Sequence, residues 1–386
     1  MLPPPSSEAL AHSQRVTEHI RSVIDAHAGW IDFARYMDMA LYAPGLGYYA
    51  AGATKFGADG DFVTAPELSP LFGRTLALQI APMVRELQGD ILELGAGSGA
   101  LAVDVLLELE RQHALPVRYC ILELSADLQA RQRQRLATQA PHLAGRVSWL
   151  DALPASFTGI IVGNEVLDAL PVHCVQWQHD KVHERGVTWN ETRFEWALRE
   201  RREGPLWQAA QSLLIDKSVL DTPYISEINV ASPALIHTLA AMLVRGAMIF
   251  IDYGFPQREY YHPQRHMGTL RAHYRHHALD DPFFLPSLCD LTAHIDFSRI
   301  AQAAVQSGLR LAGYTSQASF LIHSGITGLL TQTSPDSAAA YLPQTNALQR
   351  LISPAEMGEL FKVIAFTQNF ELPWPGFARG DRSHSL

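Results

Sequence analysis

The chain is poor in cysteine and has no long hydrophobic run. Its 386 residues include three cysteines, Cys120, Cys174 and Cys289, which lie far apart and form no C-x-x-C motif. This spacing excludes the common zinc motifs and a disulfide framework, so we expect reduced thiols in a cytoplasmic protein. No apolar run approaches the ~20 residues that span a bilayer, and we expect no membrane-spanning helix.

An excess of positive charge is also missing. The sequence has 30 Lys and Arg against 39 Asp and Glu, a formal net charge of −9. A dedicated nucleic-acid-binding protein carries a basic face, so this balance argues against such a partner. Residues 1–7 are rich in proline and serine. They lack the apolar core of a secretory signal and the arginines of an organelle presequence, which also favours the cytoplasm.

No metal-binding motif accompanies the 17 histidines. The densest group is His273, His276 and His277. His273 and His277 are four residues apart, a spacing that would place both on one face of a helix. Neither H-E-x-x-H nor a nearby pair of acids goes with them. We therefore predict a solvated or substrate-facing loop and no bound metal.

The most informative stretch is ILELGAGSG, residues 91–99. Its pattern indicates a buried strand that enters a glycine turn, followed by a helix over 100–112. The glycines permit positive φ and let a ligand approach the backbone. Glu93 precedes the turn, where a carboxylate can meet a cation or an amine. This combination suits S-adenosylmethionine (SAM), which carries a sulfonium and an ammonium but no phosphate.

Two other interpretations fit the same residues. Gly95, Gly97 and Ala100 match G-x-G-x-x-A, a fingerprint of nicotinamide or flavin dinucleotide binding, and the turn could also be purely structural. Both ligands require an acid after the next strand to hold ribose hydroxyls, and Glu123 follows residues 118–122. A carboxylate at Glu93 would repel a pyrophosphate, which favours SAM. The cofactor-binding residues predicted here are Glu93, Gly95, Ala96, Gly97, Gly99, Glu123 and Leu124.

Strands and helices alternate from residue 90 onward. Helices are expected to begin near Ala100 and Ser125, and strands are expected at 91–94, 119–122, 147–150, 159–163 and 248–252. This order predicts an α/β fold with a doubly wound, mainly parallel, Rossmann-like sheet. Right-handed crossovers then place the ligand crevice at the carboxyl ends of the strands.

Additions to this core divide the chain into three predicted regions. Residues 1–84 form a helical and lid region, with helices at 8–28 and 69–87, the latter capped by Ser69. Residues 85–325 form the core, with an inserted hairpin at 175–198 and a substrate-side loop region at 257–290. Residues 326–386 form a partly helical extension with a strand at 361–366. The loop at 60–67 could close over a ligand as a lid or serve as a surface connection.

Polar side chains gather where the predicted strands end. Asp151 could accept a hydrogen bond from the adenine amino group or could cap a helix. Methyl transfer is an in-line displacement, so the enzyme mainly positions the reactants. A guanidinium acceptor stays charged, with a pKa above about 12, and needs carboxylates to orient it. The catalytic candidates are Asn164, Glu165, Asp168 and Glu227, with Asp252 as a further acid and a turn role as the alternative for Asp168.

An ordered series of motifs resembles the MidA-type class I methyltransferases over nearly the whole chain, from about Ile20 to Phe366. The matching stretches are YMDMALYAPGLGYY (36–49), GDFVTAPELSPLFG (60–73), LELGAGSGAL (92–101), NEVLDALP (164–171), IDYG (251–254), GTLRAHYRHH (268–277), DLTAHIDF (290–297) and MGELFKV (357–363). The resemblance implies a Rossmann-like SAM-binding core with an added, largely helical region. It also implies that Gly95–Gly99 and Glu123 bind SAM, and that Asn164 and Glu165 line the reaction site.

The mitochondrial member of this family is a protein arginine methyltransferase that assists assembly of respiratory complex I. The resemblance therefore implies a protein substrate, symmetric dimethylation of an arginine, and a respiratory complex subunit as a partner. Thr64, Pro66 and Glu67 match the family loop that closes near the cofactor. Ala65, Val166 and Leu167 depart from the family pattern, and these departures concern the fit of the substrate more than that of SAM.

Two rival functions share this cofactor crevice. One is a SAM-binding assembly factor or chaperone with little turnover, which the acids at Glu165 and Asp168 disfavour. The other is a nucleotide-dependent oxidoreductase, which Glu93 and the family resemblance disfavour. Only a short segment precedes the region of resemblance, so we expect a bacterial cytoplasmic protein whose substrate can differ from the mitochondrial one.

Overall fold

The computed structural model describes residues 2–50, 64–179, 181–213, 215, 222–334 and 336–386. The chain forms two compact units, each assembled from separate stretches. Unit 1 comprises Met1–Phe62, Asp168–Pro233 and Phe255–Asp296, and unit 2 comprises Val63–Leu167, Ala234–Gly254 and Phe297–Leu386. These units do not follow the three-part division predicted at residues 84 and 325, because strand pairing joins segments that lie far apart in the sequence.

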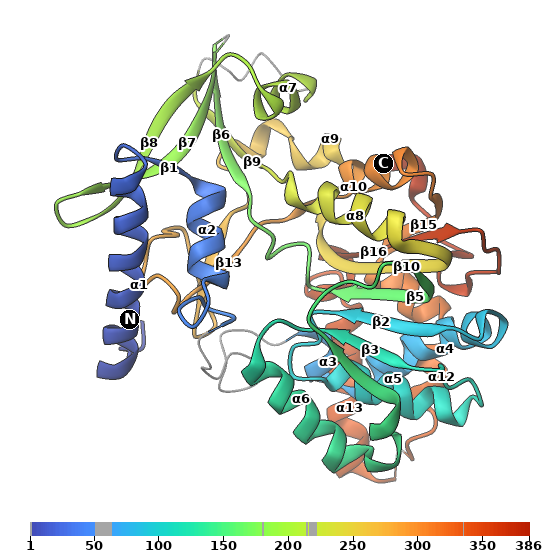
Figure 1. Ribbon diagram of the computed structural model, residues 1–386. Helices are drawn as coiled ribbons and strands as arrows, with labels where there is room; N and C mark the ends of the chain where they lie inside the picture. The colour runs from blue at the N-terminus through green and yellow to red at the C-terminus, as the bar shows by residue number, and fades with distance from the viewer. Residues whose placement is uncertain (1, 51–63, 180, 214, 216–221, 335) are drawn as a thin grey trace. The chain divides into compact units, whose positions relative to one another are not determined.

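Unit 2 contains the predicted α/β core (Figure 1). Its first elements are α3 (Ala65–Leu68), α4 (Pro70–Leu87), β2 (Asp90–Leu94), α5 (Ala100–Arg111), β3 (Tyr119–Leu122), α6 (Ala126–Gln139), β4 (Val147–Leu150) and β5 (Phe157–Asn164). The later ones are α8 (Ala231–Met242), β10 (Leu243–Phe255), α10 (Phe297–Gln306), β15 (Arg310–Ser316), α11 (Gln317–His323), α12 (Ile326–Leu330), α13 (Ala338–Ile352), α14 (Met357–Leu360) and β16 (Phe361–Gln368). Each strand predicted from the alternating pattern is present.

The sheet of unit 2 has the path β15-β16-β10-β5-β2-β3-β4. The pairs from β10 to β4 are parallel, whereas β16 is antiparallel to both of its neighbours. Helices cover both faces, with α4 and α5 on one side and α8 and α10 on the other (Figure 1). The doubly wound prediction is therefore confirmed. The strand order reverses between β2 and β5, and a crevice for a ligand forms at such a reversal.

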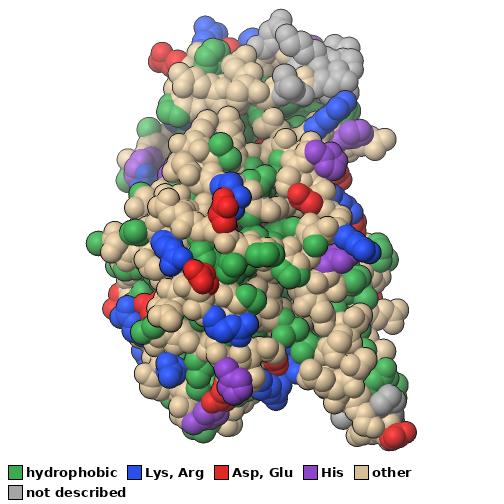
Figure 2. Space-filling view, turned by 90° about the vertical axis from the view of Figure 1, so that its right-hand side faces the viewer, with side chains coloured by type: hydrophobic (Ala, Val, Ile, Leu, Met, Phe, Trp, Pro, Cys, Tyr) green, Lys and Arg blue, Asp and Glu red, His purple; other side chains and the backbone are tan. Residues whose placement is uncertain are grey.

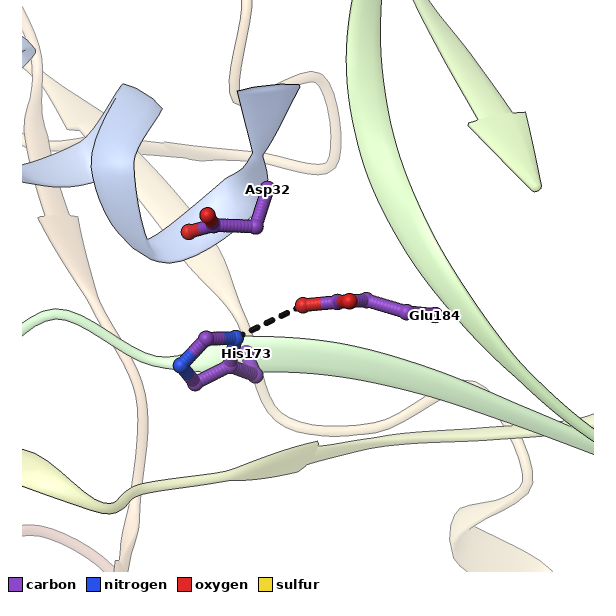
Figure 3. A group of neighbouring side chains, drawn as sticks. All are labelled: Asp32, His173 and Glu184. Atoms are coloured by element: carbon purple, nitrogen blue, oxygen red, sulfur yellow. Dashed lines mark hydrogen bonds and ion pairs between the residues drawn. The ribbon is translucent and has the colours of Figure 1, made fainter. Parts of the chain in front are cut away.

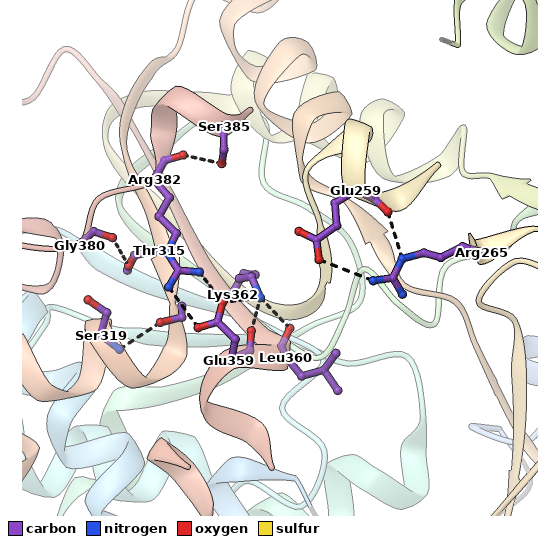
Figure 4. A network of polar contacts seen from close by, with 11 residues as sticks. Glu259, Arg265, Thr315, Ser319, Glu359, Leu360, Lys362, Gly380, Arg382 and Ser385 are labelled. Atoms are coloured by element: carbon purple, nitrogen blue, oxygen red, sulfur yellow. Dashed lines mark hydrogen bonds and ion pairs between the residues drawn. The ribbon is translucent and has the colours of Figure 1, made fainter. Parts of the chain in front are cut away.

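Local sequence explains where these elements begin and end. Ser69 accepts a hydrogen bond from the Leu71 amide (3.1 Å) and caps α4, as predicted. At the other end of unit 2, Glu359 accepts hydrogen bonds from Arg382, with 3.1 Å between Nη2 and Oε2, and Lys362 donates to the Leu360 carbonyl at 3.4 Å (Figure 4). The contact from Arg382 holds the C-terminal segment against α14, directly before β16, and the bond from Lys362 is local to the start of β16. The extension predicted beyond residue 326 thus completes the core.

Unit 1 combines a helical pair with antiparallel sheets. Its elements are α1 (Ser7–Ala26), β1 (Ile31–Asp32), α2 (Phe33–Tyr42), β6 (His173–Gln178), β7 (Lys181–Asn190), β8 (Arg193–Arg201), α7 (Pro205–Ser212), β9 (Tyr224–Ile228), α9 (Gln257–Tyr260), β11 (Arg271–Tyr274), β12 (His277–Leu279), β13 (Asp290–Thr292) and β14 (Ile295–Asp296). Strands β6, β7 and β8 pair antiparallel, which confirms the inserted hairpin. Aliphatic side chains of α1 and aromatic rings of α2 pack in its core.

The helical spacing of the histidine group does not correspond to a helix in the structure. His273 and His277 do not share a helix face, because residues 271–279 form the hairpin of β11 and β12. The turn between the strands places Arg275 (φ 46°) and His276 (φ 65°) in the left-handed region. A two-residue turn with positive φ at both positions matches the twist of paired strands, and it outweighs the helical spacing.

Among the described residues, no helix is both long and apolar enough to cross a bilayer. Acidic and basic side chains are interspersed on the face that Figure 2 shows, and the residues described there form no area of a single charge.

Candidate functional site

The glycine turn joins β2 to α5 at the reversal of strand order. Gly95 (φ 61°), Gly97 (φ 52°) and Gly99 (φ 83°) all adopt left-handed conformations, and Gly99 is the N-cap of α5. A Cβ at these positions would be strained, so the sequence needs glycine there. The turn therefore presents backbone at the carboxyl end of β2, with side chains only at Ala96 and Ser98.

Glu93 is buried one residue before β2 ends. Its side chain is 2% exposed, and Oε2 accepts a hydrogen bond from the Tyr119 hydroxyl at 2.8 Å. Burial raises the pKa of Glu93 to about 7, although the hydrogen bond from Tyr119 opposes the shift. Its partner within the unit is thus a tyrosine on the adjacent strand. Direct contact between Glu93 and a ligand amine stays a prediction.

Glu123 follows β3 and has a fixed carboxylate. Oε1 accepts from the Ser125 amide at 2.9 Å, and Oε2 accepts from Gln132 Nε2 at 3.1 Å. The next side chain, Leu124, is 79% exposed. An apolar side chain left in water beside an anchored carboxylate fits a ligand with an apolar ring and a hydroxylated sugar.

Asp151 lies exposed directly after β4. Residues 151–156 contain no helix, so the alternative role of Asp151 as a helix cap is wrong. The side chain remains at the carboxyl edge of the sheet, on the same side as the glycine turn and Glu123. Its contact with the adenine amino group stays a prediction.

Asn164 is the last residue of β5, on the other side of the reversal, and Glu165 follows it. Glu165 has φ 52°, a left-handed conformation that is unfavourable for a residue with a side chain. Its amide donates to the Ile251 carbonyl at 2.9 Å, which holds it in that conformation. Asn164 Nδ2 donates to Glu165 Oε1 at 3.2 Å. Asn164 Oδ1 is buried and has no hydrogen-bond partner among the described residues, so it is a ready acceptor for a ligand.

Asp252, three residues before the end of β10, holds the loop that follows β5 by a hydrogen bond. Its Oδ2 accepts from the Leu167 amide and its Oδ1 accepts from its neighbour Tyr253, both at 2.9 Å. The side chain is 1% exposed. We therefore interpret Asp252 as a residue that shapes the loop carrying Glu165.

The short helix α3 packs against the glycine turn. Glu67 pairs with Arg135, with 2.8 Å from Nη1 to Oε1, and also accepts from the Ser98 hydroxyl. The Ala65 amide donates to Glu165 Oε1 at 3.4 Å. Thr64 is the N-cap of α3 and Pro66 lies in its first turn. The predicted lid begins with residues 60–63, which lie outside the described residues.

Asp168 and Glu227, the other predicted catalytic acids, belong to unit 1. Asp168 lies in a turn, and its carbonyl accepts from the Ala293 amide at 3.1 Å. Glu227 is 2% exposed, and its carboxylate accepts from Tyr260, Thr269 and Leu270. Glu227 thus stabilises the segment after Gly268 by hydrogen bonds. A direct catalytic contact for Asp168 or for Glu227 stays a prediction.

A cluster that could suggest a metal lies in unit 1 (Figure 3). Asp32, His173 and Glu184 place ligand-type atoms within 4.8 Å of one another. Both Glu184 oxygens are already bonded, Oε1 to His173 Nδ1 at 2.8 Å and Oε2 to Arg201 Nε at 2.6 Å. Burial alone would raise the pKa of Glu184, but the hydrogen bonds from His173 and Arg201 bring it below its ordinary value. We interpret the cluster as a buried ion-pair network.

The sequence analysis did not identify Gln132 of α6. Its side chain is 2% exposed and contacts three elements of the site. A signal was available, because the buried residues of α6 are Leu128, Gln132 and Leu136, spaced by four. A polar residue in the middle of an otherwise apolar row is expected to have hydrogen-bond partners inside the protein.

The fold and the site together define a Rossmann-like nucleoside site: the sheet is doubly wound, a glycine turn follows one strand and a fixed acid follows the next. Comparison with known proteins identifies the cofactor. The sequence profile of the Methyltransf_28 family, which comprises S-adenosyl-L-methionine-dependent methyltransferases, matches residues 75–315. The chain belongs to this family.

Solved structures from Burkholderia thailandensis have the same fold. One is bound to S-adenosyl-homocysteine, is 49% identical, covers 100% of both chains and superposes with a TM-score of 0.95. A second is 48% identical, with a TM-score of 0.91 and the same coverage. The protein is a SAM-dependent methyltransferase, which confirms the cofactor prediction and sets aside the dinucleotide alternative.

Among curated proteins, the chain is similar to the protein arginine methyltransferase NDUFAF7 homolog, mitochondrial, of Drosophila melanogaster. The two are 28% identical over 94% of this chain and 87% of the relative. The Homo sapiens protein arginine methyltransferase NDUFAF7, mitochondrial, is 26% identical over 92% of this chain and 84% of the relative. These names describe the relatives, and the cytoplasmic location expected for this chain stays a prediction.

Proposed function

We propose that the protein methylates arginine side chains of a protein substrate. Relatives named protein arginine methyltransferases, at 26–28% identity, support this substrate class. The observation that carries the proposal is the pair formed by Asn164 and Glu165. Asn164 Oδ1 is buried and has no hydrogen-bond partner among the described residues. Nδ2 of the same side chain lies 3.2 Å from Glu165 Oε1.

These two side chains fit the needs of a guanidinium. The guanidinium has only donors, arranged in a planar fork, and it keeps its charge. Glu165 Oε1 and Asn164 Oδ1 offer acceptors that can fix this plane, while the left-handed backbone of Glu165 aims its carboxylate. Bound SAM supplies an activated methyl group. The residues of the chain then align the attacking nitrogen with that methyl group, and Glu165 can accept the proton that the nitrogen loses.

Symmetric dimethylation and a respiratory complex subunit as substrate are the finer part of the proposal, and they rest on the family resemblance. The alternative is a SAM-binding assembly factor without turnover. Both functions use the cofactor site, so activity must be measured separately from binding.

The test incubates the protein with methyl-labelled SAM and cell extract, followed by mass spectrometry of the labelled residues. We expect label on arginine, and we expect Glu165→Gln to lower the rate about 100-fold while S-adenosyl-homocysteine still binds. Glu110→Gln, at an exposed ion pair with His142, is the matched control and should label normally. Label on another residue type would refute the arginine assignment, and intact binding without any label would support the assembly factor.

A further inference from the structure

Gln132 is held in one orientation by three elements of the cofactor site. Its Nε2 donates to the Gly97 carbonyl at 2.9 Å and to Glu123 Oε2 at 3.1 Å. Its Oε1 accepts from Trp149 Nε1 at 2.8 Å. The indole can only donate and the carbonyl can only accept, so the amide can take only this orientation.

These contacts converge at the carboxyl ends of three adjacent parallel strands. Gly97 follows β2, Glu123 follows β3 and Trp149 lies in β4. Helix α6 also packs directly on the glycine turn, since a Cβ added at Gly99 would lie 3.2 Å from Gln132 Cα. The position of Gln132 and the path of the turn are therefore fixed together.

The glutamine also sets the direction of the Glu123 carboxylate. With the Ser125 amide on Oε1 and Gln132 on Oε2, each oxygen has its own donor. A carboxylate that must receive two neighbouring hydroxyl groups has to keep one plane, and paired donors from the protein impose it. Both of these donors are uncharged amide groups.

We propose that Gln132 is a positioning residue that orients Glu123 to recognise the ribose hydroxyls of SAM. The inference rests on Glu123 as the ribose ligand. Through Gln132 of α6, the orientation of Glu123 also depends on Gly97 in the glycine turn and on Trp149 in β4. Without the glutamine amide, Glu123 loses a donor and the Gly97 carbonyl loses its hydrogen-bond partner.

The test compares binding of S-adenosyl-homocysteine and its 2′-deoxy form by calorimetry. The wild-type protein should prefer the ribose form by about 10- to 100-fold, as expected for a hydrogen bond to a charged group. Gln132→Leu should reduce this preference about tenfold or more, so the affinity for the ribose form should fall more than the affinity for the 2′-deoxy form. Gln129→Leu is the matched control, because Gln129 donates to the backbone carbonyl of Glu123 at 2.7 Å and does not touch the carboxylate.

Each outcome separates the two ideas. A wild-type protein without preference for ribose would refute Glu123 as the ribose ligand. A wild-type preference that survives in Gln132→Leu, or equal weakening of both ligands, would overturn the role of Gln132. If Gln132→Leu does not fold, Trp149→Phe keeps the glutamine but removes the donor that fixes its amide. It should show a smaller loss of the same preference, and an unchanged preference would count against the proposal.

Discussion

Tyr119 donates a hydrogen bond from its hydroxyl group to Glu93, 2.8 Å away, across the adjacent parallel strands β2 and β3. Both residues are buried, and Glu93 lies two residues before Gly95, the first residue of the glycine turn. Burial raises the pKa of Glu93 to about 7 from an ordinary value of 4.5. The carboxyl group therefore exchanges its proton near neutral pH, next to the backbone that the cofactor approaches.

The first prediction concerns the pH dependence of stability. Between pH 4.5 and about 7 the folded state holds a proton on Glu93 that the unfolded chain has released. The free energy of unfolding should therefore fall as the pH rises through this window, by on the order of 3 kcal/mol. Glu93→Gln should flatten the curve in denaturant titrations, whereas Glu86→Gln, at an exposed ion pair, should leave it unchanged.

Asp104 adds to the same slope, since burial raises its pKa to about 7 as well. Asp104→Asn should therefore remove a further part of the slope, beyond the part that Glu93→Gln removes. In the protein that retains Glu93, Tyr119→Phe should shift the upper end of the Glu93 pH window to higher pH. The reason is that this variant removes the hydrogen bond that lowers the pKa of Glu93. A double variant of Glu93→Gln and Asp104→Asn with the same slope as the wild-type protein would contradict this assignment.

The second prediction concerns Gly99. Gly99→Ala places a Cβ at φ 83° and 3.2 Å from Gln132 Cα, so it should cost about 1–3 kcal/mol of stability and weaken binding of S-adenosyl-homocysteine. Gly145→Ala is the control, because a Cβ there meets nothing within 4 Å. Calorimetry and thermal unfolding check both variants. Equal behaviour of the two would show that neither the backbone conformation nor the contact with α6 matters.

The third prediction separates strain from catalysis at Glu165. Glu165→Gly should stabilise the protein by about 1 kcal/mol, because glycine adopts φ 52° without strain, and it should abolish methyl transfer. Asn164→Gly, one residue earlier in the extended strand β5, should instead destabilise it by about 1 kcal/mol. Chemical denaturation measures both changes. A loss of stability in Glu165→Gly would mean that the contacts of the Glu165 side chain stabilise the protein by more than the left-handed backbone conformation destabilises it.

The fourth prediction concerns Glu227. Glu227→Gln turns an amide group toward the donors Thr269 and Leu270, so unfolding of unit 1 should become easier by about 2–3 kcal/mol. Binding of S-adenosyl-homocysteine, which uses residues of unit 2, should be retained. Hydrogen exchange of the segment after Gly268 reports the first effect and calorimetry the second. Unchanged protection of that segment together with lost activity would favour a catalytic contact for Glu227.

The elements of the core could be predicted because their signals are local. The apolar runs before Gly95 and Glu123 and the alternation of strands with helices identify a doubly wound sheet, and the bounds predicted for β3 and β4 are those observed. Left-handed glycines and helix caps are likewise local properties of the backbone. The histidine hairpin at 273–277 shows the limit, since its turn conformation overrides a spacing that also fits a helix.

The sequence by itself determined the class of fold, the glycine turn and the acids at the strand ends, because backbone preferences and hydrophobic periodicity act over a few residues. Only the tertiary structure decided what each acid contacts. It buries Glu93 against Tyr119, surrounds Glu227 with donors from residues 260–270 and leaves Asn164 Oδ1 without a partner among the described residues. It also brings Gln132 to Glu123 and Trp149. Such contacts depend on packing between segments far apart in the chain, and no local pattern encodes their geometry.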